Sequence, residues 1–257
     1  MGHVASLWVA PVKGLGLTSP AEVDLQRTGV DDNRRFALVD EEGRRLGALR
    51  DPRLVAIGTE WDADSRRLAL RFPDGSSVED VVETDGPIET DLFSRTLRGN
   101  LVVGPWAAAL SSYLGRRVRL LESEGGGTRA VDRGRGPVTL VSEASLAELA
   151  RQAGVESVDG RRFRMLVHVG GVEAHEEDTW IGRELRLGGA VVRPLEQVAR
   201  CAITTTGPES GRRDFDTLRA IKHYRGVRDA DAIDFGIYGE VVAPGPVRVG
   251  DAVEPVS

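Results

Sequence analysis

Short apolar runs separated by turn residues are the main pattern along this chain. In the first hundred residues such runs predict strands at 4–9, 36–39, 54–60, 67–72 and 101–103. Turn residues at 40–43 and 73–75, each ending in glycine, predict hairpins between neighbouring runs. The first hundred residues therefore indicate a mostly antiparallel β unit.

Helical spacing of apolar residues is found in three later segments. The first is rich in alanine and is followed by Gly115, and the second has Ser142 as a candidate N-cap and Gly154 as its stop. The third is followed by Gly226. The predicted helices are residues 106–114, 142–153 and 216–224.

The pattern returns to strands in the second half. Strands are predicted at 162–169, 184–187, 190–193, 198–203 and 236–242, with a last strand in the alternating stretch 245–254. Residues 122–137, rich in glycine and arginine, predict a surface loop. The predicted fold is mostly β with short helices (α+β), with one barrel in each half. We place an N-terminal barrel-like domain at 1–103, and a helical connection with a second barrel at 104–257.

Charge changes this picture little but excludes some classes of partner. The chain has 34 basic and 40 acidic residues, which gives a net charge of −6, and the two signs are interspersed. Without a polybasic run, neither a nucleic acid nor a membrane surface is an expected partner. No apolar stretch is long enough to cross a bilayer, and the first residues lack the layout of a secretory signal. The cytoplasm is the expected compartment.

The chain has a single cysteine, Cys201. One thiol cannot form an intrachain disulfide, a zinc site of several thiolates or an iron–sulfur cluster. The residues also contain no glycine fingerprint of a dinucleotide or P-loop site. Cys201 is therefore a small core residue, a nucleophile or a single soft ligand to a metal that something else carries.

The turn that follows Cys201 favours the last of these alternatives. Thr204, Thr205 and Ser210 supply hydroxyl groups, and Gly207 with Gly211 lets the backbone approach a ligand closely. This combination is typical of a site for an anionic cofactor.

Four basic residues at strand ends or beside glycine are candidates for phosphate binding. Lys13 precedes Gly14, and Arg50 precedes an Asp-Pro pair. Arg35 and Arg164 each stand at the entry of an otherwise apolar run. Arginine is suited to bidentate contacts with phosphate.

A larger set of short motifs, in one order and spacing, covers nearly the whole chain. The motifs are Pro11-Val-Lys13, Arg35 to Val39, Arg50 to Leu54, Leu140 to Leu146, Arg162-Phe-Arg164, Glu177 to Trp180, Arg200-Cys201 with Thr204-Thr205, Pro208 to Gly211, Tyr224-Arg225, Phe235 to Gly239 and Val249-Gly-Asp251. Together they resemble the MOSC domain (molybdenum-cofactor sulfurase C-terminal) with its companion N-terminal MOSC β-barrel. The same arrangement is found in the amidoxime-reducing component and its bacterial relatives.

The resemblance implies a pterin-dithiolene molybdenum cofactor whose metal takes one protein thiolate. Cys201 matches the position of that ligand. Lys13, Arg35, Arg50 and Arg164 match positions that hold the pterin phosphate or frame the pocket. The turn with Thr204, Thr205 and Ser210 matches the segment beside the metal.

Three short segments depart from the usual pattern of the family. Met165 and Leu166 stand where a Pro-Asn pair is usual after the arginine. Gly14 replaces the serine that commonly follows the lysine, and Gly207 replaces the aspartate that commonly precedes the proline. Each change removes a hydrogen-bonding group from the expected pocket.

The resemblance implies a molybdenum-cofactor-dependent oxidoreductase that reduces N-hydroxylated or related small substrates, with Cys201 as the metal ligand. Because the chain has no iron–sulfur or flavin motif of its own, electrons are expected from a separate reductase or ferredoxin-like protein. Two alternatives keep the same fold. In one, Cys201 is the nucleophile of a metal-free sulfur-transfer or carbon–sulfur bond-cleaving enzyme. In the other, the protein binds and carries molybdenum cofactor without turnover.

Overall fold

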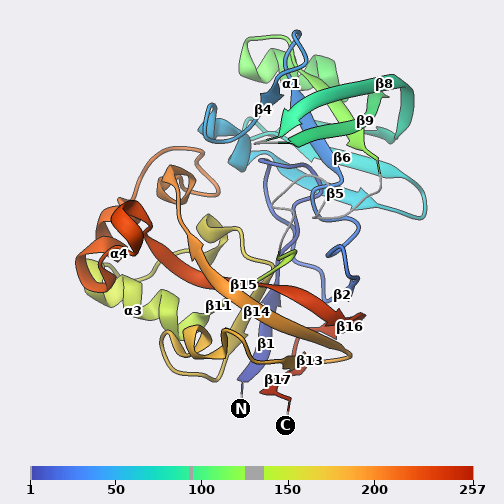
Figure 1. Cartoon of the computed structure of the whole chain (residues 1–257). Helices are drawn as coiled ribbons and strands as arrows, with labels where there is room; N and C mark the ends of the chain where they lie inside the picture. Colours follow the sequence, from blue (N-terminus) through green and yellow to red (C-terminus); the bar gives the residue numbers. More distant parts are fainter. Residues whose placement is uncertain (1, 93–94, 125–135, 257) are drawn as a thin grey trace.

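The computed structural model describes residues 2–92, 95–124 and 136–256. Within these ranges the chain forms two β-rich cores that lie one above the other (Figure 1). Short helices cover the sides of both cores. The predicted fold class, mostly β with short helices, is confirmed.

The lower core is a closed barrel of seven strands. Around the barrel these are β1 (Gly2–Leu7), β12 (Val167–Gly170), β11 (Val138–Ser142), β15 (Asp234–Ala243), β14 (Ala190–Ala199), β13 (Leu185–Leu187) and β17 (Ala252–Pro255). All neighbours are antiparallel except β11 and β12, which run parallel. Its interior is filled by aliphatic side chains such as those of Val4, Leu7 and Leu140, which are fully buried.

The upper core packs two sheets and a helix together. One sheet contains, in order, β4 (Arg45–Leu46), β3 (Phe36–Val39), β10 (Arg119–Ser123), β9 (Arg95–Val103) and β8 (Glu83–Leu92). The other contains β5 (Gly58–Asp62), β6 (Arg67–Arg71) and β7 (Ser77–Val81). Helix α1 (Trp106–Leu114) joins them, because its buried Trp106 donates an indole hydrogen bond to the carbonyl of Leu68 at 3.0 Å.

Two more helices lie against the barrel. Helix α3 (Glu143–Ala153) begins at Ser142, whose hydroxyl accepts from the Ser145 amide at 3.0 Å, and it ends at Gly154 in the left-handed region. Helix α4 (Thr217–Arg225) is capped by Asp216. The predicted helices are thus confirmed to within one residue. A two-stranded sheet of β2 (Glu22–Leu25) and β16 (Gly245–Arg248) adds to the barrel's side.

Three predicted strands are wrong over part of their length, and a short 3-10 helix replaces each part. The helix η1 (Pro52–Ala56) begins at Pro52 and covers the first residues of the predicted strand 54–60. Asp159 caps η2 (Gly160–Phe163) where the predicted strand 162–169 begins. Strand β14 ends at Ala199, and η4 (Ala202–Thr205) follows within the predicted strand 198–203. Two further 3-10 helices in the described residues are η3 (Glu176–Trp180) and η5 (Asp229–Asp231). As a result, Arg164 follows η2 and Cys201 precedes η4, so both lie in turns rather than in strands.

The first strand crosses the predicted domain division. β1 pairs with β12 and with β17, so the start of the described chain belongs to the barrel of the second half. The boundary after residue 103 stays a prediction. Most of the predicted loop at 122–137 lies outside the described residues.

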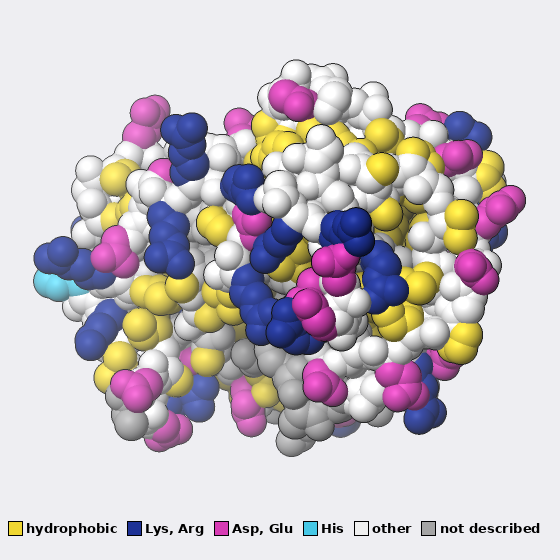
Figure 2. Space-filling model, turned by 90° about the horizontal axis from the view of Figure 1, so that it is seen from above, with side chains coloured by type: hydrophobic (Ala, Val, Ile, Leu, Met, Phe, Trp, Pro, Cys, Tyr) yellow, Lys and Arg dark blue, Asp and Glu magenta, His cyan; other side chains and the backbone are white. Residues whose placement is uncertain are grey.

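Charges are spread over the surface, as the sequence indicates. On the face in Figure 2, the largest group of lysine and arginine side chains has acidic side chains among them. In the part of the chain that the structure describes, no helix combines the length and the apolar composition that crossing a membrane needs.

Candidate functional site

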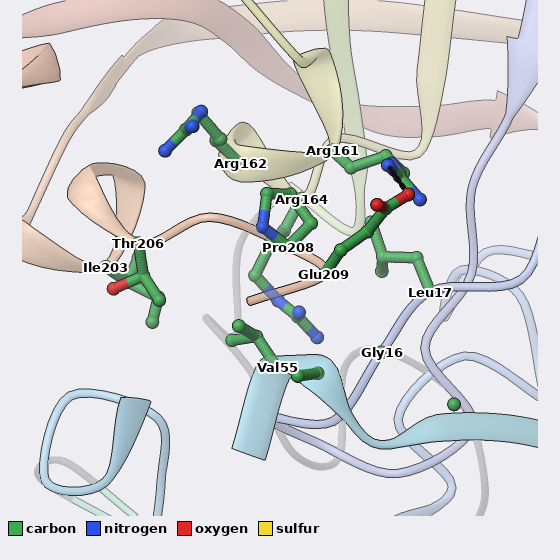
Figure 3. Close-up of a pocket in the computed structure, with 12 residues that line it drawn as sticks. Gly16, Leu17, Val55, Arg161, Arg162, Arg164, Ile203, Thr206, Pro208 and Glu209 are labelled. Carbon is green, nitrogen blue, oxygen red and sulfur yellow. Dashed lines mark hydrogen bonds and ion pairs between the residues drawn. The ribbon is translucent and has the colours of Figure 1, made fainter. Parts of the chain in front are cut away.

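A pocket of about 250 Å³ lies where the two cores meet. The barrel half contributes η2 and the turn after Cys201, and the upper half contributes η1 with the segment around Gly16 (Figure 3). The lining residues are Gly16, Leu17, Val55, Ala56, Gly58, Arg161, Arg162, Arg164, Ile203, Thr206, Pro208 and Glu209.

The arginines of the pocket come from the η2 turn. The Asp159 carboxylate accepts from the Arg161 amide at 2.9 Å and starts the turn. The turn ends at Arg164, whose φ of 54° lies in the left-handed region that residues with a side chain rarely adopt. Figure 3 shows the Arg164 side chain extending across the pocket toward Val55. The backbone conformation thus directs this cation from one half of the molecule toward the other.

Ion pairs fix the two preceding arginines. The Arg161 guanidinium lies 2.6 Å from the Asp159 carboxylate and 2.9 Å from that of Glu209, and Arg162 lies 2.7 Å from Asp214. Burial works against ionisation of Asp159, but the hydrogen bonds from Arg161 outweigh it and lower the pKa of this carboxyl. The carboxylates of Asp159, Glu209 and Asp214 thus balance the charges of Arg161 and Arg162, which leaves Arg164 as the main candidate in the pocket lining for contact with an anion.

Cys201 stands at the beginning of the other barrel turn. β14 ends two residues earlier, at Ala199, and the Cys201 carbonyl accepts from the amide and the hydroxyl of Thr204 at 3.2 and 3.1 Å. The thiol is exposed, so the alternative of an inert core cysteine is wrong. Cys201 itself does not line the pocket, but Ile203 and Thr206 of the same turn do.

The predicted hydroxyl ligands hold the turn together. Thr204 is buried, and Thr205 donates its hydroxyl to the Ala202 carbonyl at 2.7 Å. The exposed Ser210 hydroxyl accepts from the Arg212 amide at 3.2 Å. In this structure the three hydroxyls shape the loop beside Cys201, and their role as cofactor ligands stays a prediction.

Three of the four predicted phosphate ligands are not in the pocket lining. Lys13 is half-buried, and Arg50 is exposed. Arg35 donates from Nε to the Glu122 carboxylate at 2.8 Å and lies 5.4 Å over the Trp61 ring. Of the predicted cations, the structure places only Arg164 in the pocket.

Two of the departures from the family pattern do not face the pocket. Met165 and Leu166 are almost completely buried, at 1% and 2% exposure, and both belong to hydrophobic clusters. Gly14 has a φ of 93°, and a Cβ there would lie 3.4 Å from the Ala48 amide nitrogen. Glycine thus suits position 14 for conformational reasons.

The third departure, Gly207, lies in a crowded place. A Cβ at this position would clash with the Asp214 carboxylate and lie 2.6 Å from the Ser210 hydroxyl. The missing side chain is therefore replaced by a carboxylate from farther along the chain.

Sequence reasoning missed most of the pocket lining. Arg161 directly precedes the motif Arg162-Phe-Arg164, and this run of cations was the available signal for Arg161 and Arg162. Leu17 has no local signal, and the motif Pro208 to Gly211, which contains Glu209, does not indicate that Glu209 shares a pocket with Leu17.

Comparisons with known proteins agree with this architecture. The MOSC N-terminal beta barrel domain matches residues 1–117, and the MOSC domain matches residues 128–254. Mitochondrial amidoxime-reducing component 1 of Mus musculus is 26% identical over 98% of this chain and 82% of its own length. Mitochondrial amidoxime reducing component 2 of Macaca fascicularis is 28% identical over 98% and 83%, respectively. Molybdenum cofactor sulfurase of Homo sapiens is 21% identical over 98% of this chain and 32% of its own length.

Proposed function

Because this chain belongs to the MOSC-domain family, with both the N-terminal β-barrel domain and the MOSC domain, we propose that it is a molybdenum-cofactor-dependent oxidoreductase. Its substrates would be N-hydroxylated or related small molecules, as the names of the amidoxime-reducing relatives suggest. The relatives include amidoxime-reducing components and a molybdenum cofactor sulfurase, which supports an enzymatic function for this chain.

One observation carries the proposal: the turn that begins at the exposed Cys201 also lines a pocket with three arginines. A thiolate is a suitable ligand for a redox metal, and arginine is suitable for a phosphate group. The donor set therefore fits a cofactor that contains both a metal and a phosphate.

Different residues would bind the metal and the phosphate of the cofactor. Cys201 would be the metal ligand, and Arg164 would neutralise the phosphate. The side chains of Leu17 and Val55 give the pocket apolar walls, which limit the access of water. When bound, the molybdenum cofactor supplies two-electron redox chemistry at its metal.

The electrons would come from a separate reductase or ferredoxin-like protein, and the cytoplasm stays the predicted compartment. Both remain proposals that rest on the sequence. They are tested by reconstituting turnover with candidate donor proteins beside a chemical reductant.

The decisive experiment is elemental analysis of protein from a host that makes molybdenum cofactor. We expect near-stoichiometric molybdenum in the wild type and a large loss in Cys201→Ser. Reduction of an N-hydroxylated test substrate should follow the molybdenum content. Molybdenum-free wild-type protein from such a host would contradict the proposal.

The exposure of Cys201 also favours a second candidate, sulfur transfer with Cys201 as the nucleophile. The sulfurase relative is consistent with it. In that case the protein would lack molybdenum, and the Cys201 thiolate would attack the sulfane sulfur of a donor persulfide, so that Cys201 becomes a persulfide and the donor leaves as a thiolate. The third alternative, carriage of the cofactor, predicts stoichiometric molybdenum without turnover by any donor.

A further inference from the structure

The residue before the cysteine, Arg200, reaches from the cysteine turn to the pocket arginines. Its backbone amide donates to the Ile233 carbonyl at 2.8 Å. Its Nη1 donates to the carbonyl of Phe163 at 3.0 Å, and its Nε donates to the carbonyl of Phe235 at 2.7 Å. One planar guanidinium therefore joins three segments that are far apart in the sequence.

Aromatic rings and a methionine sulfur pack around this guanidinium. It lies 5.2 Å over the Phe163 ring, which in turn stacks on Phe235 with 4.5 Å between the ring centroids. The sulfur of Met165 lies 2.7 Å from Nη2. Met165, one of the departures from the family pattern, is thus part of the wall around Arg200.

The absence of a side chain at Gly236 leaves room for the Arg200 guanidinium. Its φ is 70°, and a Cβ there would lie 2.7 Å from the Leu140 carbonyl oxygen and 2.7 Å from Cε of Met165. The same Cβ would lie 3.3 Å from Nη2 of Arg200. Any side chain at this position would press on the guanidinium from one side.

The contact with Phe163 acts directly on the pocket. The Phe163 carbonyl belongs to the peptide that leads into Arg164, and Arg164 has the left-handed backbone that directs its side chain across the pocket. The ion pairs Arg161–Glu209 and Arg162–Asp214 also join the η2 turn to the segment after Cys201, but at positions several residues beyond the cysteine. Arg200 makes this connection at the residue directly before Cys201.

We propose that Arg200 is a positioning residue that sets the location of the Cys201 thiol relative to Arg164. The inference rests on the proposed function, since it assigns the thiol and the arginine to two ends of one cofactor. In this role Arg200 acts through the two backbone carbonyls to which its guanidinium donates, those of Phe163 and Phe235.

A lysine at position 200 separates this role from a general need for a cation. Lysine keeps the charge but lacks the planar fork, so it cannot bind both carbonyls in the same geometry. Gly236→Ala tests the same place without altering the arginine. Arg193→Met is the matched control, because Arg193 lies on β14, the strand that leads into Arg200, but pairs with Glu184 and Glu240.

Two readouts test the proposal. The first is the rate at which iodoacetamide alkylates Cys201 in cofactor-free protein at fixed pH. The second is the molybdenum content per chain after expression in a cofactor-making host. For Arg200→Lys and Gly236→Ala we expect an altered alkylation rate and about tenfold weaker retention of molybdenum. Arg193→Met should match the wild type in both.

Wild-type alkylation and wild-type molybdenum content in both variants would overturn the proposal, as would a change in only one readout. The folded state of each variant is checked by circular dichroism, and either variant suffices if the other fails to fold. If wild-type protein carries no molybdenum, the proposed function fails, and the alkylation rates alone then decide whether Arg200 positions the thiol.

Discussion

The carboxylate of Asp214 lies so close to Gly207 that a Cβ at position 207 would clash with it. From this place Asp214 pairs with Arg162 at 2.7 Å. A carboxylate is thus present beside Gly207 although the sequence has none at that position. The loss of the aspartate that is usual in the family is therefore compensated from the loop that leads into α4.

This relationship predicts that restoring the aspartate is harmful. Gly207→Asp should lower the free energy of unfolding by about 1–3 kcal/mol, because the new side chain clashes with Asp214 and adds a like charge. Adding Asp214→Gly should recover part of that loss. Urea unfolding of the two single variants and the double variant measures the coupling, and strictly additive effects would contradict it.

Cys201→Ser should separate stability from function. The thiol is exposed, so the free energy of unfolding should change by no more than about 0.5 kcal/mol. Molybdenum content and turnover should fall to near background. A serine variant that keeps full turnover would show that Cys201 is not the metal ligand.

Arg164 offers a sharper pair of substitutions. Both Arg164→Ala and Arg164→Gly remove the cation and should weaken cofactor retention to a similar extent. Because the backbone here is left-handed, the glycine variant should be more stable than the alanine variant by about 1 kcal/mol. Thermal unfolding checks this order. Wild-type molybdenum content in both variants would remove Arg164 from phosphate binding.

His168 should make the protein sensitive to acid. Its ring is buried next to Gly160 and Trp8, and burial lowers its pKa to about 4. In the unfolded chain this imidazole has a pKa near 6.5, whereas in the folded protein it stays neutral to much lower pH. Above pH 6.5 it is neutral in both states, and its protonation then costs the folded state nothing. As the pH falls from 6.5 toward about 4, the unfolded chain takes up the proton first, and the free energy of unfolding should fall by up to about 3 kcal/mol.

His168→Gln is the variant that checks this prediction. It should flatten the fall in the free energy of unfolding between pH 6.5 and pH 4. His223→Gln, on the exposed side of α4, is the control. An unchanged slope in His168→Gln would mean that another group causes the loss.

The sequence predicts the elements whose signals are local. The helix at 106–114 has its stop at Gly115, and the strand at 36–39 is a continuous apolar run, so both have the predicted bounds. Apolar periodicity does not distinguish a strand from a 3-10 turn of four or five residues. For this reason the predicted strands 54–60 and 198–203 wrongly include part of η1 and part of η4.

The candidate site is less predictable because its parts come from four separate segments. The resemblance identifies Cys201 and Arg164 by their motifs. It gives no sign that Arg35 pairs with Glu122, since 87 residues separate them in the sequence. Nor does a pattern of apolar residues indicate that Leu17 and Glu209 share a pocket.

The position of β1 also has a kinetic consequence. Gly2 pairs with Val253, so the barrel cannot close until synthesis has released the last strand from the ribosome. The upper core, whose β3, β9 and β10 lie between residues 36 and 123, needs much less of the chain. Contacts between distant residues form slowly. During translation the first strand is therefore made long before its partners β12 and β17 exist, and it cannot pair with them until they have been synthesised.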